Sequence, residues 1–182
     1  MSTVQTTQNS LLLNNLLQFY KKDNYLELML SIINGVSPIS LRIVDWFATN
    51  YSKQYYITYS TEHDKRFKVY NDYKLKLRAY SKKRFDPFCR WDRISIPYKN
   101  NQYIQTTIGQ LNFFKWALEN DVINYIKNHY REIEQDMNNR NSTSKRKNFT
   151  NTNKTRKKRE ELSISASKTV HREEVEIVVN FD

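Results

Sequence analysis

RISIPYKNNQYIQTTIGQLNFFKWALEN, residues 93–120, contains most of the signals that decide the fold class. Apolar and polar residues alternate over 93–98 and again over 103–106, as they do in half-buried strands. An Asn-Asn pair separates the two segments and is typical of a turn, so together they predict a β-hairpin. A Thr-x-x-Gln capping box at Thr107 then predicts that a helix begins directly after the hairpin.

Helical spacing of apolar residues dominates the chain on both sides of this stretch. Hydroxyl caps mark two of the helix starts, Ser10 and Ser37, and the second is followed by Pro38 at the first helical position. We expect helices over residues 11–20, 25–33, 38–50, 66–80, 111–118 and 122–138, and a short strand over 55–59. The sequence therefore predicts an α+β fold that is mainly helical, with one short β-hairpin.

The domain organisation follows from where apolar residues stop. Residues 1–9 are polar and are expected to form a disordered leader, and 10–138 the helical globular domain. Residues 139–170 are too polar to offset the entropy of ordering the backbone, and they predict a disordered basic linker. Within the last segment, 171–182, apolar residues alternate over 175–181. That alternation predicts a C-terminal docking strand, which either returns to the core or binds another protein.

Positive charge is concentrated in two parts of the chain, whose net charge is +11 over 182 residues. Residues 65–99 contain 12 Lys/Arg against 3 Asp/Glu, and residues 139–172 contain 11 against 2. The last ten residues, 173–182, contain 4 acids and no base. Two basic blocks with few compensating carboxylates predict two regions that contact a polyanion.

Several classes of protein are disfavoured by what the sequence lacks. One cysteine, Cys89, allows neither an intramolecular disulfide nor a multi-cysteine zinc site, and only 2 glycines leave no phosphate-binding glycine loop. No apolar run is long enough to span a bilayer, and the polar N-terminus does not resemble a signal peptide. We expect a reducing compartment, no membrane contact, no metal and no cofactor.

The catalytic candidates are weak. His63 and His129 are best interpreted as part of a polar turn and of a solvated helix face. Asp72-x-Lys74 resembles part of the acid and lysine set of metal-dependent nucleases, but that set requires a strand, where residues i and i+2 share a face. These residues lie in a predicted helix, so we expect the protein not to be an enzyme.

The block at 65–99 has two interpretations. In the first, its cations form a patch that neutralises phosphates, and aromatics such as Tyr80, Phe85 or Trp91 stack on unpaired bases. In the second, the aromatics are core and the cations are only the solvated side of the fold. The candidate nucleic-acid contacts, with Trp91, are Lys74, Lys76, Arg78, Lys82, Lys83, Arg84, Arg90 and Arg93. The excess of nine positive charges over 65–99, 12 Lys/Arg less 3 Asp/Glu, favours the first interpretation.

The second basic block also has two interpretations. Paired basic clusters are typical of nuclear import signals, and a disordered basic arm raises non-specific affinity for nucleic acid. The candidate residues are Lys145, Arg146 and Lys147, followed by Arg156, Lys157, Lys158 and Arg159.

Four segments are similar to sequences of a known protein family: SLRIVDWFATNYSK (40–53), YNDYKLKLRAYSKKRFDPFCRW (70–91), TTIGQLNFFKWALENDVINYI (106–126) and the ending EVEIVVNFD. From about Ser40 to its end the chain resembles an uncharacterised protein family of nucleocytoplasmic large DNA viruses, especially mimivirus-like ones. The resemblance implies a viral protein made in the host cytosol, and it implies no activity or catalytic residues.

The sequence therefore predicts a non-enzymatic nucleic-acid-binding accessory protein of a large DNA virus, acting in replication, transcription or genome packaging on DNA or RNA. The alternative is a structural or adaptor protein of the virion or viral factory that binds proteins through residues 175–181. The expected location is the host cytoplasm or the virion, with the nucleus accessible through the clusters at 145–159.

Overall fold

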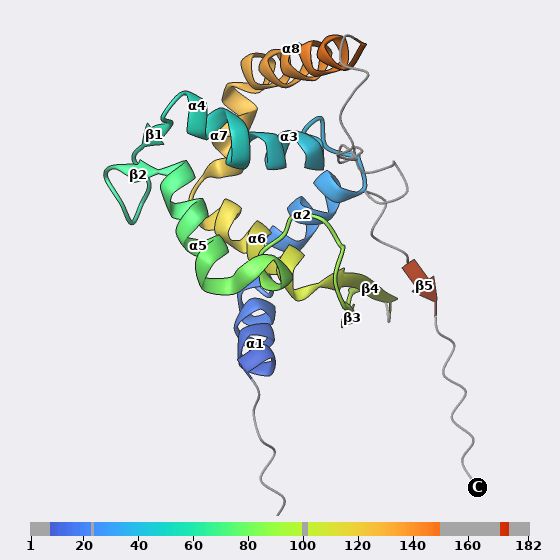
Figure 1. Ribbon diagram of the computed structural model, residues 1–182. Helices are drawn as coiled ribbons and strands as arrows, with labels where there is room; N and C mark the ends of the chain where they lie inside the picture. Colours follow the sequence, from blue (N-terminus) through green and yellow to red (C-terminus); the bar gives the residue numbers. More distant parts are fainter. Residues whose placement is uncertain (1–7, 23, 100–101, 150–171, 175–182) are drawn as a thin grey trace, which may run out of the picture.

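Helices make up most of the structure, a computed structural model that describes residues 8–22, 24–99, 102–149 and 172–174 (Figure 1). The helices are α1 Gln8–Tyr20, α2 Tyr25–Ile33, α3 Leu41–Trp46, α4 Ser52–Gln54, α5 Val69–Arg84, α6 Ile108–Glu119, α7 Val122–Asn128 and α8 Tyr130–Phe149, and a π-helical turn, η1 Phe47–Tyr51, joins α3 to α4. The strands are β1 Thr58–Tyr59, β2 Phe67–Lys68, β3 Arg93–Pro97, β4 Gln102–Thr107 and β5 Arg172–Glu174. The predicted mainly helical α+β class is confirmed.

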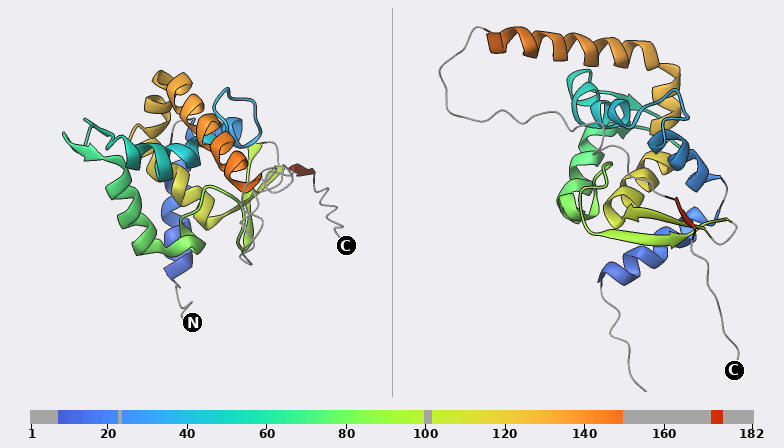
Figure 2. Two further views of the ribbon diagram at one scale, coloured as in Figure 1. Left: turned by 45° about the horizontal axis from the view of Figure 1, so that its top comes forward. Right: turned by 90° about the vertical axis from the view of Figure 1, so that its right-hand side faces the viewer.

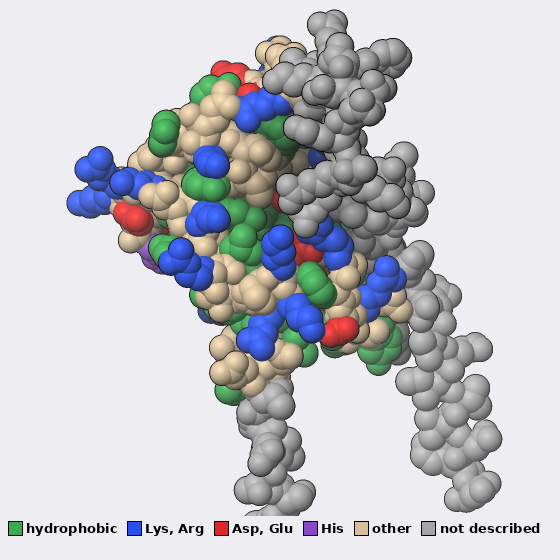
Figure 3. Space-filling view, viewed as in Figure 1, with side chains coloured by type: hydrophobic (Ala, Val, Ile, Leu, Met, Phe, Trp, Pro, Cys, Tyr) green, Lys and Arg blue, Asp and Glu red, His purple; other side chains and the backbone are tan. Residues whose placement is uncertain are grey.

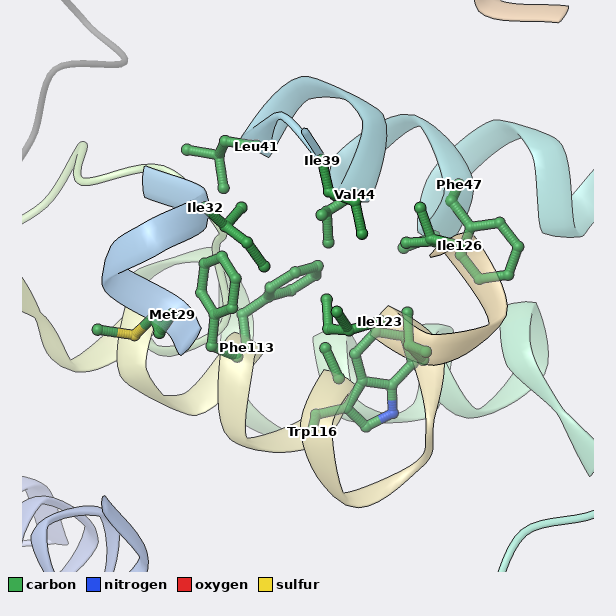
Figure 4. Close-up of a cluster of buried hydrophobic side chains, with 14 of the residues drawn as sticks. Met29, Ile32, Ile39, Leu41, Val44, Phe47, Phe113, Trp116, Ile123 and Ile126 are labelled. Atoms are coloured by element: carbon green, nitrogen blue, oxygen red, sulfur yellow. The ribbon is translucent and has the colours of Figure 1, made fainter. Parts of the chain in front are cut away.

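Helix α6 lies at the centre of the core, where it contacts α1, α5, α7 and β4. Phe113 and Trp116 extend from it among side chains of α2, α3, η1 and α7 (Figure 4). Phe113, Val44 and Phe47 have no solvent-accessible surface. Each large apolar side chain buried in this way contributes roughly 1.5–3 kcal/mol relative to leaving it exposed.

The predicted hairpin is present, and it leads directly into α6. Strands β3 and β4 are antiparallel, with Ile96 opposite Ile104, and both of these side chains are buried. The Thr107 hydroxyl caps α6 by accepting the N–H of Gln110 at 3.0 Å, as the capping box predicts. Strand β5 adds to β4 on the side away from β3. The hairpin and α8 lie on opposite sides of the central helices (Figure 2).

Several predicted boundaries are wrong. The third helix is capped by Ser40, whose hydroxyl accepts the N–H of Ile43, and not by Ser37. Helix α1 begins at Gln8, so Ser10 lies inside it. The helical segment that follows Ser40 extends to Gln54, which shortens the strand predicted at 55–59 to Thr58–Tyr59. Residues 67–68 pair with β1 as strand β2, and α5 begins only at Val69 but continues to Arg84.

Helix α8 extends beyond the end predicted near Asn138. Its first turns pack through Ile133 and Met137, and Asp136 accepts hydrogen bonds from the indole N–H of Trp46 and the hydroxyl of Tyr55. The helix continues to Phe149, so residues 139–149 are not the disordered segment that the composition predicted. The predictions for residues 1–7, 150–170 and 175–181 lie outside the described residues.

Candidate nucleic-acid interface

Helix α5 presents one polar, basic face to solvent. Asn71, Lys74, Leu75 and Arg78 follow one another at helical spacings of three and four, and all four are exposed. They line a shallow surface depression of about 310 Å³. Lys and Arg side chains recur across this side of the molecule, whereas acidic ones are few (Figure 3). The opposite face of α5 packs inward, so the helix is fixed in orientation with its cations outward.

A kink at Ser81 turns the chain at the end of this face. Ser81 has φ 60° and ψ 170°, a region that is essentially reserved for glycine and that costs of the order of 1–3 kcal/mol for other residues. Lys82 and Lys83, which follow directly, are both exposed. The strained residue therefore sets the direction in which two adjacent ammonium groups leave the helix.

The N-terminal turn of α6 holds the segment after the kink. The Asn112 side-chain amide donates to the carbonyl of Arg84 at 2.8 Å, and that of Gln110 donates to the carbonyl of Pro87 at 2.9 Å. The backbone N–H of Asp86 donates to the carbonyl of Gly109 at 3.2 Å. These three hydrogen bonds hold the backbone of residues 84–87 against the core, next to the exposed Lys82 and Lys83.

Gly109 is required for this close approach. A Cβ atom at that position would lie 2.9 Å from the carbonyl oxygen of Lys83 and 3.3 Å from the backbone nitrogen of Phe85. Both neighbours are backbone atoms, which cannot move aside as the end of a flexible side chain can. Nothing in the sequence indicates this contact, since one glycine near a helix start has no spacing signal of its own.

Trp91 is the aromatic residue of this loop that faces solvent. Phe85 is only 2% exposed, and Tyr80 packs beside it with a centroid separation of 6.4 Å. The Trp91 side chain is 39% exposed, and the ammonium of Lys83 lies 6.0 Å from its ring centroid. Of the three aromatics singled out as stacking candidates, the structure thus places two in or against the core and one at the surface beside a cation.

Arg90 neutralises a buried acid. Its Nε and Nη2 atoms donate to the two carboxylate oxygens of Asp86 at 2.8 and 2.5 Å, and Asp86 is 3% exposed. Burial, and then the charge of Asp86, raises the pKa of nearby Asp45 from 3.8 to about 6, while Arg90 opposes that rise. Arg90, which the sequence predicts as a phosphate contact, therefore has a structural role. The signal was the i, i+4 spacing of an acid and an arginine.

The other predicted contacts divide by exposure. Lys76 and Arg84 are half-buried, and Arg84 Nη1 donates to the side-chain oxygen of Gln8 at 3.5 Å. Arg93 is exposed and pairs across the hairpin with Thr107, the cap of α6. Five of the predicted contacts are exposed and make no ion pair with any described residue, and we call these five the basic surface: Lys74, Arg78, Lys82, Lys83 and Arg93.

The second basic block is described only in part. Lys145, Arg146 and Lys147 lie in the last turns of α8. The second cluster, Arg156, Lys157, Lys158 and Arg159, lies outside the described residues.

Residues that could have carried chemistry have structural roles. Asp72 accepts the indole N–H of Trp116 at 2.6 Å and lies in α5, so it shares no strand face with Lys74. His129 stacks on Tyr125 with ring centroids 4.1 Å apart. Cys89 is buried, and burial raises the pKa of its thiol.

The described part of the chain has neither a cluster of metal-ligating residues nor a membrane-spanning helix. No group of three or more His, Cys, Asp or Glu is placed there to hold a metal ion. None of the helices in that part combines the length and the apolar character needed to cross a membrane.

A family model for a family of unknown function, DUF7197, matches residues 2–180. The chain belongs to this family. One relative is an uncharacterized protein of Acanthamoeba polyphaga mimivirus, 45% identical over 129 residues, which are 66% of this chain and 50% of the mimivirus protein. The chain thus spans about half the length of that curated relative. No solved structure matches this chain. The resemblance to an uncharacterised family of large DNA viruses is confirmed, and membership of the DUF7197 family adds no activity.

Proposed function

We propose that the protein is a non-enzymatic nucleic-acid-binding accessory protein of a large DNA virus, acting in replication, transcription or genome packaging. The observation that carries the proposal is the basic surface: five exposed cations, Lys74, Arg78, Lys82, Lys83 and Arg93, with no ion pair to any described residue.

The electrostatics of this surface favour a polyanionic ligand. Cations that no carboxylate offsets repel one another, and a phosphate backbone relieves that repulsion while releasing its own condensed counterions. The backbone on either side of Lys82 and Lys83 is held by the kink at Ser81 and by the bond from Asn112 to the Arg84 carbonyl, so little additional backbone ordering is needed when they bind. A solubilising charge would require neither the strained backbone nor the anchoring.

The test is a pair of charge reversals matched in chemistry and net charge. Lys82→Glu/Lys83→Glu alters the basic surface, and Lys21→Glu/Lys22→Glu alters another exposed Lys-Lys pair, just beyond the end of α1 opposite Gln8. In fluorescence anisotropy with a labelled oligonucleotide, the first variant should bind at least about tenfold more weakly than the second, because it loses two phosphate contacts. Equal affinities of the two variants would reject the assignment of the site.

The proposed location is the host cytoplasm, in a viral factory, or the virion. The basic clusters at 145–159 would add charge to the interface or carry the protein into the nucleus. Deleting the second cluster should weaken binding without abolishing it if the basic surface is the principal site.

One observation supports a second role, that of an adaptor in a virion or factory. Strand β5 adds to the edge of β4, with Glu174 opposite Gln102, so the C-terminal region of this chain can join a sheet edge. If residues 175–181 bind a viral protein in the same manner, main-chain hydrogen bonds and apolar contacts would provide the affinity. Affinity for such a partner should change little with salt, which separates this role from nucleic-acid binding.

A further inference from the structure

A second exposed aromatic residue, Tyr56, stands out by its backbone conformation. Its φ is 49°, a left-handed conformation that is an outlier for a bulky residue. Its side chain is 85% exposed, so no burial of the ring offsets the strain. Strained residues that the surrounding structure holds in place are concentrated at sites of function. Tyr56 follows the end of α4, where the N–H of Ile57 donates to the carbonyl of Ser52 at 3.1 Å, and this turn leaves the Tyr56 ring in solvent.

Tyr56 and Trp91 lie near opposite ends of α5. The carbonyl of Ile57, the next residue after Tyr56, accepts the N–H of Val69, the first residue of α5, at 3.3 Å. Trp91 is joined to the other end of the helix through Lys83, whose ammonium lies 6.0 Å from the Trp91 ring centroid. The straight part of α5, from Val69 to the kink, spans about 18 Å at 1.5 Å per residue.

Exposed cations follow α5 toward the end at which Trp91 lies. Lys74 and Arg78 lie on the exposed face of α5, and the exposed Lys82 follows directly after the kink at Ser81. At one phosphate per about 3.4 Å along a stacked strand, the about 18 Å of the straight part of α5 corresponds to roughly five nucleotides. Single-strand sites in other proteins combine the same two features, a basic track and aromatic rings on which bases stack.

We propose that this protein binds single-stranded nucleic acid along the exposed face of α5, with phosphates on Lys74, Arg78 and Lys82 and unpaired bases stacked on Tyr56 and Trp91. The proposal rests on the proposed nucleic-acid-binding function and specifies its ligand. Bases in a duplex already stack on their neighbours and cannot offer a free face to either ring without being pulled from the helix. The two rings therefore distinguish an unpaired strand from a duplex of equal charge.

The test uses the full chain and oligonucleotides of 4, 8, 12 and 16 nucleotides, single-stranded and duplex. Tyr56→Ala and Trp91→Ala should each weaken single-strand binding by about 5- to 150-fold, the effect of losing one stacked base. Duplex binding should change less than about twofold. Affinity should rise steeply with length up to roughly eight nucleotides and then level off. Tyr103→Ala is the matched control, because Tyr103 is also 39% exposed but lies on strand β4.

A second readout guards against misfolding. Bases stacked on Trp91 should quench its fluorescence, whereas Trp46 and Trp116 donate their indole N–H groups to Asp136 and Asp72 inside the fold. Quenching should be lost in Trp91→Phe, a variant that keeps a ring and therefore most of the affinity. Tyr56→Phe should bind like the unaltered protein, because the stacking surface remains.

The outcomes separate this proposal from the one on which it rests. Single-strand binding that both alanine variants retain, together with loss of binding in Lys82→Glu/Lys83→Glu, would overturn the stacking proposal and leave nucleic-acid binding intact. A duplex preference would do the same. No binding to any oligonucleotide would overturn both. Measurements on a DNA strand and an RNA strand of the same sequence identify which sugar the site accepts.

Discussion

Arg90→Ala tests how the fold uses one cation of the basic block. The substitution leaves Asp86 buried without its bidentate partner and still close enough to Asp45 to raise the pKa of that carboxyl. Removing one member of a fully buried ion pair costs about 3–5 kcal/mol. Because the Arg90 side chain is 46% exposed and water can partly replace it, we expect a loss of about 2–4 kcal/mol in the free energy of unfolding at pH 7.

Urea unfolding followed by circular dichroism measures this loss, with Arg93→Ala as the control. Arg93 is exposed and pairs with no described acid, so its removal should cost less than about 0.5 kcal/mol. Lowering the pH to about 4 should narrow the difference between Arg90→Ala and the unaltered protein, because protonation of Asp45, whose pKa is raised to about 6, removes its repulsion of the buried Asp86. If Arg90→Ala is as stable as Arg93→Ala but binds nucleic acid much more weakly than the unaltered protein does, Arg90 is a phosphate contact and the structural role is wrong.

Three further substitutions test single features of the fold. The pKa of Asp45 is raised to about 6 in the folded protein, so between pH 4 and 6 this carboxyl binds more protons in the folded than in the unfolded chain. Stability should therefore fall as pH rises through this window. In urea titrations, Asp45→Asn should flatten this pH profile and stabilise the protein at pH 7 by up to about 3 kcal/mol. Gly109→Ala should cost about 1–3 kcal/mol in thermal unfolding, because its Cβ atom meets the Lys83 carbonyl at 2.9 Å, and an unchanged melting temperature would mean that this approach is looser. Ser81→Gly should raise the free energy of unfolding by about 1 kcal/mol, since relief of the φ 60° strain exceeds the entropy that glycine adds to the unfolded chain, and a loss of stability would show that Ser81 is not strained.

Local signals in the sequence were sufficient for much of the fold. The hairpin, the capping box at Thr107 and helix α2 were predicted because each depends on neighbours within a few residues. Helix starts were less predictable, because Ser37 and Ser40 are equally good caps in isolation and only packing of the following residues decides between them. The polar composition after Asn138 predicts disorder and has no helical spacing of apolar residues, so the last turns of α8 were not predicted.

The candidate site was predictable in composition but not in arrangement. Clustered Lys and Arg identified the segment. Arg90 does not belong to the basic surface, because it pairs with Asp86, and counting charges cannot show that Asp86 is buried. Phe85 and Trp91 are both aromatics in a basic segment, and only the packing of Phe85 against Phe113 and Trp116 of α6 separates them. Tyr56 gave no signal at all, because its positive φ and exposed ring become visible only in three dimensions.

The most direct test of the basic surface is the salt dependence of binding by the full chain. Five phosphate contacts predict that log K falls with log[salt] at a slope of about −3.5 or steeper on single strands. Lys82→Glu/Lys83→Glu should make that slope shallower by about 1.4, whereas Lys21→Glu/Lys22→Glu should leave it unchanged. An affinity that does not respond to salt, or equal slopes for the two variants, would contradict the proposal that these cations meet phosphate.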